Sequence, residues 1–295
     1  MRKLFVAALL LAPALAWAKV PVVASFSIVA DITREIGGDK VEVLSLVGAD
    51  QDAHVFQPSP ADVRKLAAAK VFVVSGLGFE GWMPRMTRAA GFKGLTVVAA
   101  ARVKPLAVQE EGHHEHDGHD HGSVDPHAWH NPQNVMLYAD AIATGLAKAD
   151  PASGDYFRQR ADAYKGKLKE LDAWAAQQFA GVPAARRKVL TSHEAFGYLA
   201  ARYQIRFLAP QGVSTEAEAS AKAVARLIQQ VKKEQVKAVF FENMADKRLL
   251  QQLGKEAGVN PGGKLYADAL SSDGKAASYL QLFRSNVTSL LSAMR

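Results

Sequence analysis

Short apolar runs rich in β-branched residues alternate with segments of helical periodicity through the first third of the chain. The runs predict four strands, at Pro21–Ser27, Val41–Val47, Val71–Ser75 and Leu95–Ala100. Between them, Ile28–Ile36 and Pro60–Ala69 predict helices, because their apolar residues recur every three to four positions. Such alternation of strands and helices indicates a mostly parallel sheet flanked by helices.

Two long helical patterns occupy the middle of the chain. Within Asn134–Ala149, the residues Val135, Tyr138, Ile142 and Leu146 share one face. Pro151 then opens a longer pattern that ends near Gly181. At ~1.5 Å per residue this helix would be on the order of 40 Å long, which is long enough to run along two domains.

The alternation resumes after the long helix. Further strands are predicted at Lys188–Thr191, Ile205–Ala209, Ala238–Glu242 and Lys264–Ala269, with helices at Glu194–Tyr203, Ala219–Lys233, Asp246–Ala257 and Ala276–Met294. Four strands before the long helix and four after it predict an α/β fold of two similar lobes, although no residue-level repeat relates them. We expect an N-terminal lobe at residues 19–150, a long linking helix at 151–181 and a C-terminal lobe at 182–295.

The first eighteen residues have the pattern of a secretory signal peptide. Arg2 and Lys3 precede the apolar run Leu4–Leu15, and Ala16-Trp17-Ala18 offers a cleavage site with small residues. The run is shorter than the ~20 residues that a membrane-spanning helix needs, and no later segment reaches that length. We therefore expect a soluble product that begins near Lys19 and is exported to the periplasm.

Composition limits the chemistry that the chain can perform. The sequence contains no cysteine, so a lipid anchor on cysteine, disulfides and thiolate metal ligands are not expected, and nitrogen or oxygen must hold any metal. Loss of Arg2 and Lys3 with the signal peptide lowers the formal net charge from +7 to +5. The remaining basic residues are scattered among acidic ones, which argues against nucleic-acid binding.

Seven of the nine histidines fall within His113–His130, which indicates metal chemistry. A loop at residues 110–124 is rich in glycine, acids and histidine, and we expect weak, auxiliary metal binding from its five imidazoles, those of His113, His114, His116, His119 and His121. The alternative is a merely solvated tract. His127 differs, because it lies in Asp125–Pro132, where two prolines stiffen the backbone and Trp129 supplies an apolar anchor. We treat His130 as a rim residue that binds no metal.

Three further residues lie where predicted strands end, which is where open α/β sheets gather their ligands. His54 follows the second strand in a loop stiffened by two prolines, His193 follows the first strand of the second lobe, and Asp268 stands near the end of the last strand. Each has a simpler explanation alone, as a structural histidine or a helix cap. The neighbouring Glu194 is better explained as a first-turn helix acid than as a partner of His193.

The segments DAHVFQPSP, DPHAWHNP, TSHEAFGYLA and LYADALSS occur in this order along the chain, with an acidic, histidine-rich loop before the second. Together they resemble the periplasmic zinc-binding proteins of ABC importers, the ZnuA-like branch of the zinc and manganese solute-binding family. The resemblance implies two α/β lobes joined by one rigid long helix, with a metal in the cleft between them. The ligands that it implies are His54, His127, His193 and Asp268. Ala219 departs from the proline usual in the family, which affects local loop shape.

Three imidazoles and a carboxylate favour Zn²⁺, because manganese sites contain more oxygen and have higher coordination numbers. Mn²⁺ is our second choice, and copper would also bind. The expected function is capture of zinc in the periplasm and its delivery to an ABC permease in the inner membrane, by a monomer. A zinc chaperone or buffer, or a manganese-binding homologue, remains an alternative. A zinc hydrolase is least favoured, because four protein ligands leave no open position and no HExxH motif occurs.

Overall fold

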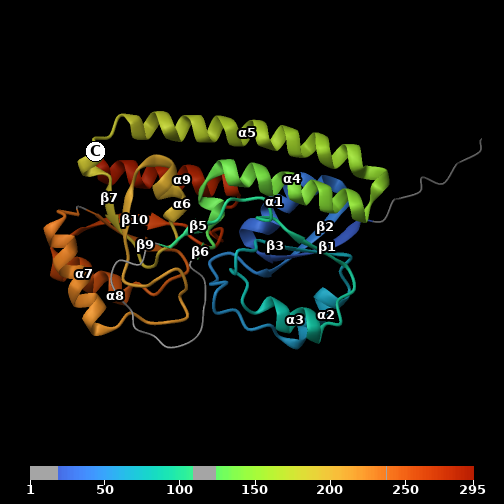
Figure 1. The fold of residues 1–295 in the computed structure, drawn as a ribbon, viewed down its shortest axis with the longest axis horizontal. Coiled ribbons are helices and arrows are strands. Elements are labelled where there is room, and N and C mark those ends of the chain that lie inside the picture. The colour runs from blue at the N-terminus through green and yellow to red at the C-terminus, as the bar shows by residue number, and fades with distance from the viewer. Residues whose placement is uncertain (1–18, 109–123, 237) are drawn as a thin grey trace, which may run out of the picture.

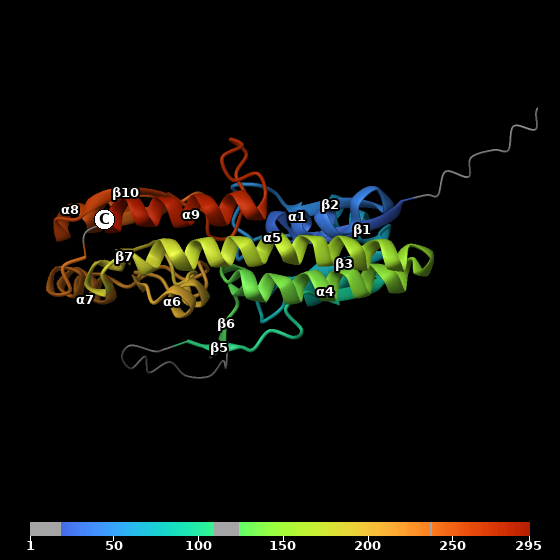
Figure 2. The same cartoon turned by 90° about the horizontal axis from the view of Figure 1, so that it is seen from above.

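The computed structural model describes residues 19–108, 124–236 and 238–295 (Figure 1). The predicted signal peptide and the loop histidines His113–His121 lie outside these residues. Within the described ranges the chain forms two α/β lobes that lie side by side under a layer of long helices (Figures 1 and 2). The predicted fold class is therefore confirmed. No helix in these ranges is long and apolar enough to cross a membrane.

The N-terminal lobe contains a four-stranded sheet in the order β2-β1-β3-β4. Its strands are β1 (Val20–Phe26), β2 (Val41–Val47), β3 (Val71–Val74) and β4 (Leu95–Val98). All three pairings are parallel, so the carboxyl ends of the strands meet at one edge of the sheet. Each strand lies within two residues of its predicted bounds, because the apolar runs in this lobe end at clear turn signals.

Helices cover both faces of this sheet (Figure 1). One face carries α1 (Ser27–Gly37) and α4 (Pro132–Ala149), and the other carries α2 (Pro60–Ala67) and α3 (Met83–Ala89). Ser59 begins α2 with a capping box to Asp62, and Pro60 follows at the first helical position. The loop from β2 to α2 is therefore fixed at its far end. Helix α3 was not predicted.

The C-terminal lobe repeats the plan with the strand order β10-β9-β7-β8, again all parallel. Its strands are β7 (Lys188–Leu190), β8 (Arg206–Leu208), β9 (Ala238–Glu242) and β10 (Asn260–Leu265). The predicted position of the last strand, Lys264–Ala269, is wrong. The strand begins earlier because β10 is an edge strand, where Pro261 is tolerated beside a register shift. Asp268 consequently lies in the turn beyond the strand.

Four helices surround this second sheet: α6 (Gly197–Tyr203), α7 (Ala221–Lys233), α8 (Arg248–Ala257) and α9 (Tyr279–Met294). A small apolar core, separate from the main one, joins α7 and α8 to the sheet through residues such as Leu227 and Leu253. Helix α6 begins three residues later than predicted, so Glu194 lies before the helix and not in its first turn.

The long helix α5 (Gly154–Ala180) follows a short 3-10 turn at Pro151–Ser153 and runs along both lobes (Figures 1 and 2). Its 27 residues correspond to ~40 Å. One side of α5 is buried and belongs to the main hydrophobic core, which includes residues of both lobes. This side includes Phe157, Tyr164, Leu168, Leu171 and Ala175. The lobes therefore share a core along this helix.

Asp172 fixes the middle of α5 to both lobes. Its carboxylate accepts two hydrogen bonds from the guanidinium of Arg202 (2.9 and 2.6 Å) and one from the hydroxyl of Tyr203 (2.7 Å), both on α6. It also accepts one from the amide of Gln133 on α4 (3.2 Å). Burial alone would raise the pKa of Asp172, but these donors hold it below its usual value. The ionised carboxylate thus links the helix to each lobe.

Candidate metal centre

Four buried side chains from four separate segments converge where the two lobes meet. His54 comes from the loop between β2 and α2, and His127 follows the short strand β6 (Val124–Asp125), which pairs with β5 (Leu106–Ala107). His193 follows β7, and Asp268 lies beyond β10. One ligand atom from each residue lies within 4.8 Å of those from the other three. The structure therefore brings together the four residues that the family resemblance implied as ligands.

The spacing of these atoms suits a small divalent cation. The Nε2 atoms of His54 and His127 are 3.2 Å apart. Oxygens of Asp268 lie 3.4 Å from Nε2 of His54, 3.5 Å from Nε2 of His127 and 3.1 Å from Nε2 of His193. A tetrahedron with zinc–ligand bonds of about 2.0–2.1 Å has edges of about 3.3–3.4 Å. These four distances, which involve both oxygens of Asp268, are close to the edges of such a tetrahedron, and the whole set of ligand atoms lies within 4.8 Å.

Three of the atoms in the centre make no hydrogen bond of normal geometry within the described ranges. Neither oxygen of Asp268, nor Nε2 of His193, makes a hydrogen bond of normal geometry with the described residues, and all three are buried. A buried carboxylate without a hydrogen bond is costly, because burial removes its hydration, and only the nearby imidazoles offset this cost in the metal-free protein. A bound cation would supply the missing interactions, so the residues present fit a metal.

Two buried carboxylates orient two of the imidazoles from behind. Asp125 Oδ1 lies 2.8 Å from Nδ1 of His127 and also accepts a hydrogen bond from its backbone N–H. Glu242 Oε2 lies 2.6 Å from Nδ1 of His193, while Oε1 accepts from the backbone N–H groups of Ser192 and His193. A carboxylate at Nδ1 favours the tautomer that has its proton there, so Nε2 offers its lone pair to the centre.

The charges within the centre shift two pKa values in the metal-free protein. Burial by itself would lower the pKa of His193, but the charges of Glu242 and Asp268 outweigh it and hold that pKa well above 6.5. Burial would likewise raise the pKa of Asp268, whereas His193 and His127 hold it well below its usual value. A proton on His193 therefore occupies the position that a cation would take.

Aromatic rings form one wall of the centre. The ring of Phe79 lies 4.7 Å from that of His54 and 5.8 Å from that of His127, and the ring of Trp129 lies 5.3 Å from that of His127. Trp129 is fully buried, as predicted for an apolar anchor, and its indole donates a hydrogen bond to the carbonyl of Ala267 (2.9 Å). This wall excludes water and connects the His127 turn to the segment that bears Asp268.

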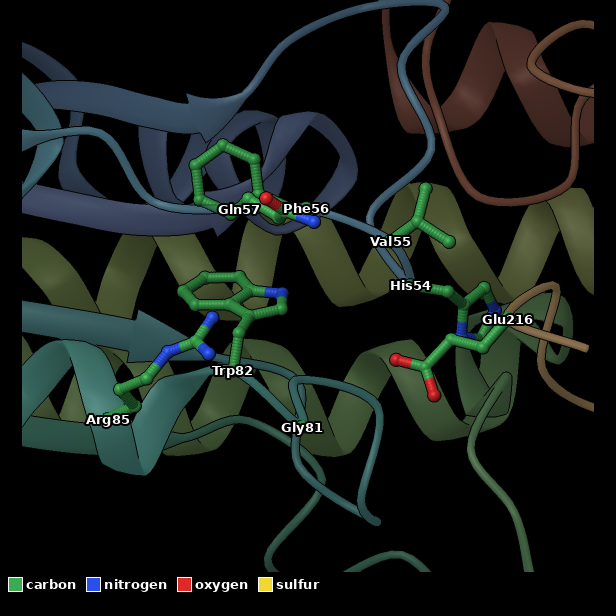
Figure 3. A pocket seen from close by; sticks show the side chains of 8 residues that line it. All are labelled: His54, Val55, Phe56, Gln57, Gly81, Trp82, Arg85 and Glu216. Carbon is green, nitrogen blue, oxygen red and sulfur yellow. The ribbon is translucent and has the colours of Figure 1, made fainter.

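His54 is the ligand candidate closest to solvent. Its exposed fraction is 7 %, whereas those of the other three are 0 %. It lines a pocket of about 390 Å³ together with other residues of its loop, Gly81, Trp82, Arg85 and Glu216 (Figure 3). The centre is therefore buried on all sides except the one formed by His54.

His130 does not join the four ligand candidates, as predicted, but its predicted place at the rim is wrong. It lies in the 3-10 turn Ala128–His130 (η2), which directs the ring inward, and its exposed fraction is 0 %. The ring packs 4.6 Å from that of Phe196, and burial lowers the pKa of His130 to about 3. It is therefore a neutral core residue.

Sequence reasoning gave no role to Asp125 or Glu242, the two carboxylates behind the imidazoles. Asp125 stands two residues before His127, and this spacing allows a side chain to accept the backbone N–H of a residue two positions on. The role of Asp125 could therefore have been predicted from this spacing in the sequence. Glu242 is 49 residues away from His193 along the chain, and only the adjacency of β7 and β9 brings it there.

Comparison with known proteins identifies the family. The profile described as "ZnuA: Zinc-uptake complex component A periplasmic" matches residues 22–293. The chain belongs to this family. It is accordingly a substrate-binding protein of a metal ABC transporter, and the resemblance seen in the four sequence segments is confirmed.

Relatives within this family differ in the metal after which they are named. The manganese-binding lipoprotein MntA of Bacillus subtilis (strain 168) is 31% identical over 280 residues, covering 93% of this chain and 89% of that protein. The iron-binding protein YfeA of Yersinia pestis is 30% identical over 273 residues, covering 92% and 85%. A structure titled periplasmic zinc binding protein TroA, from Treponema pallidum, has a TM-score of 0.85 at 26% identity and covers 94% of this chain and 99% of its own.

Proposed function

We propose that His54, His127, His193 and Asp268 bind one Zn²⁺ ion, which the protein carries as cargo. The observation that supports this most strongly is the convergence of three imidazole nitrogens and a carboxylate, with buried atoms that make no hydrogen bond of normal geometry with the described residues. This set suits zinc, because zinc is commonly four-coordinate and binds both nitrogen and oxygen ligands. Manganese, the second candidate, is favoured by more oxygen and by octahedral coordination.

A metal competition experiment tests the choice of cargo. The purified protein is stripped of metal and equilibrated with equal, buffered concentrations of free Zn²⁺, Mn²⁺ and Fe²⁺ under anaerobic conditions, and the bound metal is measured by mass spectrometry. We expect close to one zinc per chain. Retention mainly of manganese or iron would overturn the assignment of zinc, while leaving a metal transport role intact. An Asp268→Ala variant serves as the control that should lose the tightly bound ion.

We further propose that the protein works in the periplasm as a monomer and delivers zinc to an inner-membrane ABC permease. Membership of a family of ABC transporter substrate-binding proteins supports a permease as the receiver. A chaperone that passes zinc to other periplasmic proteins would use the same centre. We propose no catalytic activity, because four protein ligands would leave zinc no free position for a substrate.

Uptake of radioactive zinc by cells separates the permease from the chaperone role. Cells that lack the gene should take up zinc slowly when it is scarce, and the wild-type protein should restore uptake whereas His127→Ala should not. Restored uptake must also require the cognate permease. If uptake is normal without the protein, but periplasmic zinc enzymes lack their metal, the chaperone role is correct instead.

The five loop histidines at residues 113–121 are proposed as an auxiliary, weak zinc-binding segment. Their clustering with acidic residues supports this, because carboxylates attract cations. Deletion of residues 112–122 should lower the total zinc bound at high concentration and leave one tight equivalent. Competition titration with a chelator of known affinity measures both quantities, and loss of the tight equivalent would place a loop histidine among the main ligands.

A further inference from the structure

The three imidazoles of the centre are not equivalent. His127 and His193 each have a buried carboxylate at Nδ1, from Asp125 and Glu242 respectively. Among the described residues, no carboxylate faces Nδ1 of His54. Only the backbone N–H of His54 is held by a carboxylate, that of Asp52. The side chain of His54 is therefore the one that can rotate with least loss of hydrogen bonding.

The pocket beside His54 is the side from which the centre can be reached. Asp268, His127 and His193 are fully buried, and His54 forms part of the lining of the pocket. Its two charged lining residues have opposite sign. Both Glu216 and His54 line the pocket, and Figure 3 shows the carboxylate of Glu216 on the same side of Trp82 as His54, with Arg85 on the other side.

Glu216 reaches this position through a contact between the lobes. The hydroxyl of Thr215 donates to Oδ2 of Asp52 (2.7 Å), which ties the C-terminal segment bearing Glu216 to the loop of the N-terminal lobe. The other oxygen, Oδ1 of Asp52, accepts from the backbone N–H of His54 (2.9 Å). One carboxylate thus sets the positions of both Glu216 and His54.

Glu216 is exposed, and its carboxylate makes no hydrogen bond or ion pair with the part of the chain that the structure describes. A divalent cation enters a buried site by exchanging its waters for protein ligands in steps, and a carboxylate offers an oxygen at an early step. Arg85 repels a cation from the far side of the pocket. The favourable approach therefore passes Glu216 before it reaches His54.

Building on the proposed function, we propose that Glu216 is a transit ligand, which binds the metal ion on its way between solvent and the four-residue centre and releases it once His54 has turned inward. The same contact lowers the barrier in both directions, because entry and exit share one path. Glu216 accordingly sets how fast the metal exchanges and contributes little to how tightly it is finally held.

Stopped-flow kinetics on the full mature protein tests this assignment. Loading is started by mixing with Zn²⁺, and release by mixing the zinc-loaded protein with a fluorescent chelator in excess. Glu216→Gln should slow loading and release alike, by about threefold or more, and leave the dissociation constant unchanged. Glu216→Asp, which keeps the charge, should recover part of the rate.

The matched control is Glu218→Gln, which removes the same charge from an exposed residue of the same segment. It should leave both rates near those of the wild type. The proposal is overturned if Glu216→Gln changes neither rate, if Glu218→Gln slows exchange equally, or if Glu216→Gln weakens affinity through faster release, which would make Glu216 a ligand of the bound ion. Failure of the wild type to bind zinc tightly would instead refute the proposed function.

Discussion

Replacing Glu242 with glutamine should weaken zinc binding without unfolding the protein. The exposed fraction of Glu242 is 1 %, and its carboxylate accepts from two backbone N–H groups and faces Nδ1 of His193. Glutamine has the same shape, and its carbonyl oxygen can keep the backbone bonds. Its NH₂ group must then face Nδ1 of His193. Since two donors cannot share that contact, the ring proton must move to Nε2, the atom that should bind zinc.

The expected loss follows from this change of tautomer. Removing a carboxylate that orients a metal-binding histidine typically costs about 10- to 100-fold in affinity, or about 1.4–2.7 kcal/mol. A second effect opposes it in part. The charge of Glu242 also helps to raise the pKa of His193, so its loss makes that proton easier to displace. The net loss of zinc affinity should therefore be larger at pH values above the raised pKa of His193, where the wild-type ring is already neutral, than at pH values below it.

Competition titration with a zinc chelator at several pH values measures this effect. Circular dichroism should show the same fold for both proteins. Glu256→Gln, at an exposed position of α8, is the matched control and should bind zinc as the wild type does. Affinity of Glu242→Gln within twofold of the wild type at every pH would refute the argument that Glu242 orients His193.

Three further predictions follow from the geometry. Gly197→Ala, at the start of α6, should weaken zinc binding measured by calorimetry, because its Cβ would overlap Oδ2 of Asp125; unchanged affinity would contradict this. The pKa of His193 is raised in the folded protein, so its protonation stabilises the metal-free protein fully below about pH 6.5. This stabilisation is lost as the pH rises through the raised pKa. Zinc binding, in contrast, requires the neutral ring of His193. The gap in melting temperature between zinc-loaded and metal-free protein should therefore widen from about pH 6 to about pH 8, and a constant gap would contradict it. Thr215→Val removes a hydrogen bond to Asp52, worth about 1 kcal/mol, that holds the segment bearing Glu216, and should slow zinc release in stopped flow as Glu216→Gln does, which an unchanged or faster rate would contradict.

Sequence periodicity predicted the fold well where strands are buried and end at turn signals. The runs at Val41–Val47 and Ala238–Glu242 coincide with β2 and β9. The prediction failed at β10, whose residues Asn260–Leu265 include a proline and two glycines and are mostly exposed. This segment is a strand because it pairs with β9, and the local pattern of apolar and polar residues does not indicate such pairing.

Loop and strand-end positions drew attention to the candidate residues one by one, and the family resemblance combined them into one ligand set. His54 and His127 were marked by neighbouring prolines and His193 by a strand end, whereas the strand predicted around Asp268 was misplaced; the fold brings all four together. The environment of each side chain was not predictable. The inward turn of His130 and the contact between Glu242 and His193 depend on packing between segments distant in the sequence, which local signals do not encode.

Anomalous diffraction at the zinc absorption edge, from crystals of the protein loaded with one equivalent of zinc, tests the central claim most directly. We predict one strong peak between the lobes, bonded at about 2.0–2.1 Å to Nε2 of His54, His127 and His193 and to an oxygen of Asp268. A main peak at any other place in the protein, or a zinc ion held there without the imidazoles of His127 and His193, would contradict the account.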